Sequence, residues 1–250
     1  MVEHQNTDLT TFFIGTSGWT YEHWKGCFYP ESLARKKWFD FYSTRFNAVE
    51  INATFYRSFR DQTYLNWKAH APQGFGYVLK VPKTITHRKL LKDVEVDIQA
   101  FCQSAALLEE SWKMVLLQVP PNLTYDPGLL RAALQVFPDP SRVAVEFRHD
   151  SWFNADIERL LSTLGVAFCN VDSPRHALTD FLTSERAYIR LHGREHWYSS
   201  NYPDEDLVYL ASLLRRLSVR GAREVYVFFN NDFGGFAPAN ALTLKRFLDS

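Results

Sequence analysis

The feature that most constrains the fold is a series of eight short segments rich in β-branched and aromatic residues, separated by longer segments of helical periodicity. Parallel strands need a crossover between them, usually a helix, and this alternation indicates a parallel sheet. Eight such units in 250 residues predict a closed, TIM-barrel-like (β/α)8 barrel. The expected strands are FFIGT (12–16), AVEIN (48–52), GYVLKV (76–81), MVLLQV (114–119), RVAVEFR (142–148), VAFCNV (166–171), AYIRLH (187–192) and EVYVFFN (224–230).

The segments between these strands predict helices near 31–46, 60–70, 95–112, 127–136, 154–164, 204–220 and 237–248. The stretch 172–186 is too short and broken for a helix to be expected there. The chain shows no linker and no low-complexity segment. We therefore expect an N-terminal tail at 1–11 and a single barrel domain at 12–250.

The strands carry polar residues near their C-terminal ends, where barrels of this class place their active sites. Because side chains alternate across a strand, Glu146 and Arg148 should point inward while Val145 and Phe147 meet the helices. The same alternation predicts a polar inward layer made of Glu50, Asn52, Lys80, Gln118, Asn170, Asp172, Arg190, His192 and Asn230. We expect this layer to face an open, wet cleft. The alternative is a sealed layer of salt bridges, since three acidic and three basic residues balance there.

Composition and net charge indicate which classes of binding partner to expect. Formal net charge is zero, which gives no support to a long nucleic acid as partner, although a local basic cleft would be compatible with one. Aromatic residues make up 16% of the chain, enough to line a pocket that stacks on rings or sugars. Three cysteines without CxxC spacing, a polar N-terminus and no membrane-length apolar run predict a cytoplasmic protein that has no membrane partner.

Seven motifs resemble the YecE-like family, also called domain of unknown function seventy-two. They are IGTSGWTYEHWKGCFYP (14–30), VEINATFYRS (49–58), ITH (85–87), LLQVPP (116–121), AVEFRHDSW (144–152), YIRLHG (188–193) and FNND (229–232) with APANA (237–241). The resemblance runs over nearly the whole chain and implies a TIM-barrel-like fold. It implies no particular reaction.

Loops after the strands supply further candidates. His87 could act as acid, base or phosphate donor, and Trp19 and Trp197 could cover a ligand. Glycines 193, 234 and 235 follow strands seven and eight, where barrels commonly bind phosphate through backbone amides. We therefore expect an anionic or phosphate-bearing small ligand. The predicted binding residues are Lys80, His87, Arg148, Trp19, Tyr56, Asp172, Gly193, Trp197, Asn230, Gly234 and Gly235.

The favoured hypothesis is hydrolysis of a phosphate ester or phosphodiester. Glu146 or Glu50 would act as general base, Arg190 would stabilise charge on phosphoryl oxygens, and His192 would protonate the leaving group. Two alternatives stay open: a glycoside hydrolase and a non-catalytic binder of a small anionic metabolite. Carboxylate and imidazole groups of Glu146, Asp172 and His192 could hold a divalent metal, but no tight ligand spacing supports it, so no metal is predicted. No motif in the sequence identifies a cofactor.

Overall fold

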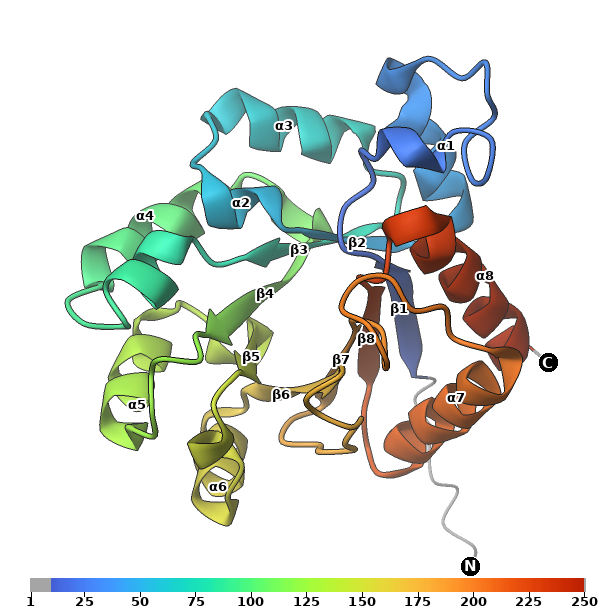
Figure 1. Ribbon diagram of the computed structural model, residues 1–250. Coiled ribbons are helices and arrows are strands. Elements are labelled where there is room, and N and C mark those ends of the chain that lie inside the picture. Colours follow the sequence, from blue (N-terminus) through green and yellow to red (C-terminus); the bar gives the residue numbers. More distant parts are fainter. Residues whose placement is uncertain (1–9, 250) are drawn as a thin grey trace, which may run out of the picture.

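The computed structural model describes residues 10–249, and within them eight parallel strands form a ring (Figure 1). The hydrogen-bonded order is β1-β8-β7-β6-β5-β4-β3-β2. Their bounds are β1 (Thr11–Thr16), β2 (Ala48–Ile51), β3 (Gly76–Lys80), β4 (Trp112–Val119), β5 (Val143–Phe147), β6 (Ala167–Asp172), β7 (Arg186–Leu191) and β8 (Glu224–Phe229). The TIM-barrel-like fold predicted from the alternation is confirmed.

Helices surround the ring on its outer side (Figure 1). They are α1 (Trp38–Arg45), α2 (Ala53–Tyr56), α3 (Asp61–His70), α4 (Glu95–Ala106), α5 (Pro127–Val136), α6 (Ala155–Leu164), α7 (Asp204–Val219) and α8 (Phe236–Asp249). Asp126 caps α5 by accepting a hydrogen bond from the amide of Leu129, directly before a proline at the first helical position. No helix within 10–249 is long and apolar enough to cross a bilayer.

Strand bounds differ from the expected ones by two residues at most, but two helices are shorter than expected. The helix expected over 31–46 begins at Trp38, after a single 3-10 turn, and the one expected over 95–112 ends at Ala106. Several short elements were not expected, among them α2 and a π-helical turn at Thr84–Arg88 that carries His87. Single turns carry too little periodicity to be recognised in a sequence.

The ring closes between β1 and β2 through one bridge, which pairs Ser17 with Glu50. The buried Tyr42 hydroxyl joins the two strands: it accepts from the Thr16 amide at 2.9 Å and donates to the Ala48 carbonyl at 3.0 Å. Gly15 is required at this closure, because a Cβ there would lie 2.0 Å from the Ala48 carbonyl oxygen.

Two apolar layers pack on the strands. Outward residues such as Val145 and Phe147 join the core beneath the helices, and inward residues such as Ala144 and Leu116 fill the barrel. Alternation along β5 is therefore as expected.

The expected facing of β6 is wrong. Its inward residues are Ala167, Cys169 and Val171, so Asn170 and Asp172 point away from the barrel interior. The reason is the missing helix after β6. A loop covers the outer face instead, and its backbone needs polar partners: the Asn170 amide group bonds both the N–H and the C=O of Phe181.

Candidate functional site

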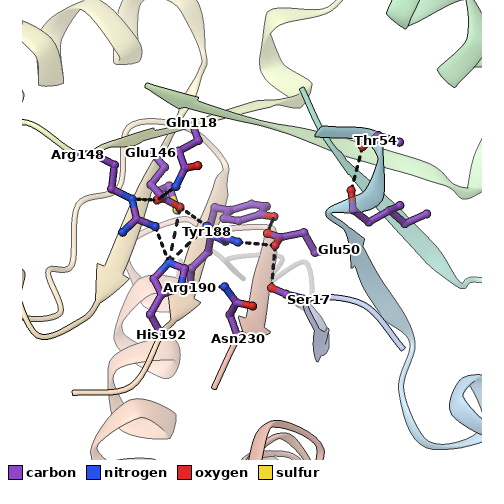
Figure 2. Close-up of polar contacts among 12 residues, drawn as sticks. Ser17, Glu50, Thr54, Gln118, Glu146, Arg148, Tyr188, Arg190, His192 and Asn230 are labelled. Carbon is purple, nitrogen blue, oxygen red and sulfur yellow. Dashed lines mark hydrogen bonds and ion pairs between the residues drawn. The ribbon is translucent and has the colours of Figure 1, made fainter. Parts of the chain in front are cut away.

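The centre of the polar layer is a buried ion-pair cluster contributed by three strands. Arg190 of β7 bridges two carboxylates, with Nη2 2.7 Å from Glu50 Oε1 of β2 and Nη1 2.5 Å from Glu146 Oε2 of β5 (Figure 2). The side chains of Glu50 and Glu146 have no exposed surface, and Arg190 has 1%. The layer is thus sealed at its centre, as in the alternative raised from charge balance.

Both carboxylates in the cluster have partners besides Arg190. Ser17 Oγ donates to Glu50 Oε1 at 2.7 Å, and the Tyr188 hydroxyl donates to Glu50 Oε2 at 2.6 Å. Glu146 Oε1 accepts from Gln118 Nε2 at 2.6 Å and forms an ion pair with Arg148. Hydrogen bonds and opposite charges of this kind compensate for burying an ion.

The electrostatics keep both carboxylates ionised. Burial alone would raise the pKa of Glu50. The charge of Arg190 and the hydrogen bonds that the Glu50 carboxylate accepts lower this pKa below its ordinary value. Burial is likewise outweighed at Glu146, where the charges of Arg148 and Arg190 hold the pKa well below its usual range. A carboxylate so stabilised and so enclosed is a weak base with no route to a substrate proton.

His192 lies between the two guanidinium groups and is fully buried. Arg148 Nη2 lies 3.0 Å from its Nε2 and Arg190 Nη1 lies 3.3 Å from it, and both arginine groups can only donate. Nε2 therefore accepts from the arginines, and Nδ1 lies 3.0 Å from Asn230 Nδ2. Burial, then the Arg190 charge, lowers the pKa of His192 to about 4. The imidazole is neutral and orients the arginines, which supports a positioning role rather than proton donation.

Above this sealed layer lies a cavity of about 300 Å³, here called the arginine cavity. Its lining comprises His87, Gln118, Pro121, Arg148, Arg175, His176, Trp197 and Tyr198. Gln118 and Arg148 connect it to the cluster, because both also contact Glu146. The Arg148 guanidinium stacks over the Trp197 ring at 5.1 Å.

The loop after β7 shapes one wall of this cavity. Gly193 has φ +95°, and a Cβ there would lie 2.5 Å from the His196 carbonyl oxygen. Tyr198 adopts the left-handed region at φ 64°, and its amide returns to the His192 carbonyl at 2.6 Å. Backbone held in this way at a pocket is typical of functional loops, and it presents Trp197 and Tyr198 to the cavity.

The structure brings six of the predicted site residues into one connected set: Glu50, Glu146, Arg148, Arg190, His192 and Asn230. His87 and Trp197 line the arginine cavity beside them. Lys80 lies at the end of β3, with its Nζ 4.3 Å from the centre of the Phe55 ring.

Other predicted residues lie elsewhere. Trp19 lines a separate cavity with Trp67 and Arg57, Tyr56 is 68% exposed, and Asp172 pairs with Arg194. The Gly193 amide donates to the Tyr202 hydroxyl.

The two glycines after β8 serve packing and turning. The Gly235 amide donates to the Asp232 carbonyl, and a Cβ on Gly235 would lie 2.6 Å from Cys27 Sγ. Gly234 has φ +73° and turns the chain before α8. Amides of Gly193 and Gly235 expected to hold an anion thus already donate within the protein.

Sequence reasoning missed several residues of the site. Ser17 and Tyr188 donate hydrogen bonds to the Glu50 carboxylate. Arg175 and His176 line the arginine cavity from the loop after β6. That loop lacks a helical pattern, so its sequence predicts no helix there. Its place after a barrel strand was the available signal, since such loops build the site in this fold.

Within residues 10–249, no group of three His, Cys, Asp or Glu side chains is arranged to hold a metal ion. Glu146, Asp172 and His192, which the sequence offered as possible metal ligands, do not converge. Asp172 points away from Glu146 and toward Arg194.

Three comparisons place the chain among known proteins. It is 26% identical to the UPF0759 protein YunF of Bacillus subtilis, covering 95% of this chain and 94% of that one. The UPF0759 protein YecE of Escherichia coli is 28% identical over 66% of this chain and 61% of its own. A crystal structure of a DUF72 family protein from Thermotoga maritima superposes with a TM-score of 0.87 at 31% identity, covering 96% and 100% of the two chains.

A second DUF72 family structure, from Enterococcus faecalis, has a TM-score of 0.84 at 21% identity, covering 96% of each chain, and shows the same fold. The family model described as "Protein of unknown function DUF72" matches residues 13–250. This span includes every residue of the ion-pair cluster and of the arginine cavity. The chain belongs to the DUF72 family.

Proposed function

We propose that the protein binds a small anionic ligand carrying a phosphate group in the arginine cavity. One observation carries the proposal: the cavity lining, among the described residues, contains two arginines and two histidines and no acidic side chain. Such a concave surface raises the local concentration of an anion and favours its binding.

Arg175 is the strongest candidate ligand. Its guanidinium is exposed and has no ion pair or hydrogen bond among the described residues, so it can approach an anion without losing a partner. Arg148 differs, because its Nε faces Glu146 and its Nη2 faces His192. A bound phosphate would therefore meet a fixed guanidinium on one side and an adaptable one on the other.

Trp197 and Tyr198 would cover the organic part of the ligand. Trp197 already stacks on Arg148, and Tyr198 is 45% exposed at the rim. Aromatic faces of this kind suit a flat or apolar group next to a phosphate.

Hydrolysis of a phosphate ester is the second candidate function, favoured by His87. This side chain lines the cavity, its Nδ1 lies 2.8 Å from Thr86 Oγ1, and burial followed by the Lys80 charge lowers its pKa. A neutral, accessible imidazole can accept a proton from an attacking water. Glycoside hydrolysis has less support, because arginines hold both buried carboxylates ionised.

Calorimetric titration with inorganic phosphate and with glycerol phosphate tests the binding proposal. We expect Arg175→Gln to weaken phosphate binding roughly tenfold or more, because one charge-assisted hydrogen bond contributes about 1.5–3 kcal/mol. The matched control is Arg88→Gln, another exposed arginine, which lies outside the cavity lining. Absence of phosphate binding by the wild type, or an equal loss in both variants, would reject the proposal.

A further inference from the structure

Lys80 is a largely buried lysine whose amine the cluster leaves without a partner. The residue ends β3 with 9% of its surface exposed, and Thr54 Oγ1 fixes its backbone by donating to its carbonyl at 2.7 Å. Among the described residues, no acceptor lies within hydrogen-bond or ion-pair distance of Nζ, which lies 4.3 Å from the centre of the Phe55 ring. Lysines as enclosed as this one are normally paired, so Lys80 requires an explanation.

Charge balance makes Lys80 the surplus cation. Glu50 and Glu146 are already matched by Arg148 and Arg190, one guanidinium for each carboxylate. Burial, then repulsion from Arg190, lowers the pKa of Lys80 to about 8. A sizeable fraction of the amine is therefore unprotonated near neutral pH, and an unprotonated amine is a nucleophile.

His87 links this amine to the arginine cavity. Its ring lies 4.9 Å from the Phe55 ring, the same ring that Lys80 Nζ contacts at 4.3 Å, and it also lines the cavity. A neutral imidazole at that position can move protons to and from a group reacting with Lys80.

We propose that Lys80 forms an imine with an aldehyde or ketone whose phosphate group is held by Arg175 and Arg148. This inference rests on the proposed anion binding and adds the class of ligand. The Nζ lone pair attacks the carbonyl carbon and the carbonyl π bond opens to give a carbinolamine. The C–O bond then breaks, the oxygen leaves as water with both amine hydrogens, and one proton from solvent converts the imine to an iminium ion.

Reductive trapping tests the inference on the intact protein. The protein is incubated with glycolaldehyde phosphate and sodium cyanoborohydride, whose hydride converts the imine to a stable secondary amine, and the labelled lysine is located by peptide mass mapping. We expect labelling of Lys80 at least about tenfold faster than of Lys83, which follows β3 nearby, because burial lowers the pKa of Lys80 and the aldehyde phosphate is held beside it. The Lys80 rate should rise with pH up to about 8 and then level off.

Three controls assign the reaction. Lys80→Arg keeps a positive charge and removes the nucleophile, and Lys83→Arg is the matched variant that should change nothing at Lys80. Glycolaldehyde without phosphate should label Lys80 more slowly, and Arg175→Gln should reduce labelling by the phosphorylated aldehyde to that lower rate. Because wild-type mapping gives the site directly, the test does not depend on the folding of Lys80→Arg.

The outcomes separate this inference from the proposed function. Phosphate binding with no preferential labelling of Lys80 overturns imine formation and leaves anion binding standing. Preferential labelling that is insensitive to the phosphate and to Arg175→Gln overturns the phosphate-bearing ligand class. Neither binding nor labelling rejects both.

Discussion

Glu146 shows how a single buried residue can be misjudged from a strand pattern. Alternation correctly placed it inward, but the expectation that it faces an open, wet cleft is wrong: its side chain has no exposed surface. The side chains of Gln118, Arg148, Arg190 and His192 surround it, and they occupy the space that a cleft would need. Its carboxylate holds two arginines in place, one of which reaches the arginine cavity.

Glu146→Gln should therefore destabilise the protein by about 3–5 kcal/mol, the cost of leaving buried charges unpaired. The new amide nitrogen would face groups that only donate, Gln118 Nε2 on one side or Arg190 Nη1 on the other. Urea denaturation followed by circular dichroism measures the change. Glu158→Gln, at an exposed glutamate of α6, is the control and should stay within about 0.5 kcal/mol of wild type. A change that small at Glu146 would mean that its charge does not stabilise the arginines.

His192 predicts a specific pH dependence of stability. Its pKa falls from 6.5 to about 4 on folding, so between these values the unfolded chain binds a proton that the folded protein does not. The contribution of the neutral His192 to the free energy of unfolding should be complete above pH 6.5. It should fall by up to about 3 kcal/mol as pH drops toward 4.

Urea midpoints measured from pH 7.5 to 4 test this dependence, with His192→Gln as the variant. The variant should lose most of the slope over this window, and the remainder comes from His87 and His176, whose pKa values burial also lowers. His70→Gln, at an exposed histidine of α3, should keep the full slope. The two buried glutamates act at lower pH: their folded pKa values are lowered, so their contribution is lost only as pH falls below the ordinary carboxyl range. An unchanged slope in His192→Gln would contradict the neutral buried imidazole.

At the scale of elements, β6 and the loop after it depart from the pattern of the other units. A helix normally covers the outer face of a barrel strand with apolar side chains. Here a loop covers it, and Asn170 and Thr183 supply the hydrogen bonds that its backbone and the strand end require. The same loop carries Arg175 into the arginine cavity, so the departure also builds the proposed site.

Asn170→Ala should loosen this loop. The substitution removes an acceptor for Thr179 Oγ1 and the Phe181 amide and a donor to the Phe181 carbonyl, which leaves half-buried backbone groups unpaired at a cost of about 1 kcal/mol. Limited proteolysis should cleave the variant within 173–185 faster than the wild type, and phosphate binding should weaken with it. Asn66→Ala, at an exposed asparagine of α3, should do neither. Equal cleavage rates in both variants would show that Asn170 does not hold the loop.

The sequence could predict some features of the fold and the site but not others. Strand bounds and barrel class were predictable because period-2 and period-3.6 patterns report burial on one face of each element. Glu50, Glu146 and Arg190 were found because charges in apolar strands are rare. The facing of β6 was not predictable, because it depends on what covers the strand. Sealing of the cluster was not predictable either, since it requires side chains such as Ser17 and Gln118 to meet in space.

At the scale of the whole molecule, the barrel depends on closing between β1 and β2. The other neighbouring strands share longer ladders, whereas this pair is joined by one bridge and by the Tyr42 hydroxyl. The bridge residue Ser17 also donates to Glu50, which binds Arg190. Closure and the ion-pair cluster are thus parts of one connected network.

Gly15→Ala should test this closure directly. Its Cβ would lie 2.0 Å from the Ala48 carbonyl oxygen and 2.8 Å from the Tyr42 hydroxyl, so β1 and β2 would have to separate. We expect a loss of about 3 kcal/mol or more in the free energy of unfolding, at the upper end of what overpacking costs. Gly128→Ala is the matched control: its Cβ would make only an ordinary contact at 3.6 Å within α5, where alanine favours the helix by about 1 kcal/mol.

Gly15→Ala shows whether the contact between β1 and β2 is rigid or can adjust to an added methyl group. If β1 and β2 separate, Ser17 moves away from Glu50, Arg190 loses its fixed partner and phosphate binding in the arginine cavity should weaken in the part of the protein that stays folded. Urea denaturation and calorimetry on the same preparation measure both effects. Stability within about 0.5 kcal/mol of wild type together with unchanged phosphate binding would mean that the closure absorbs an added methyl group, and that the cluster holds its geometry without it.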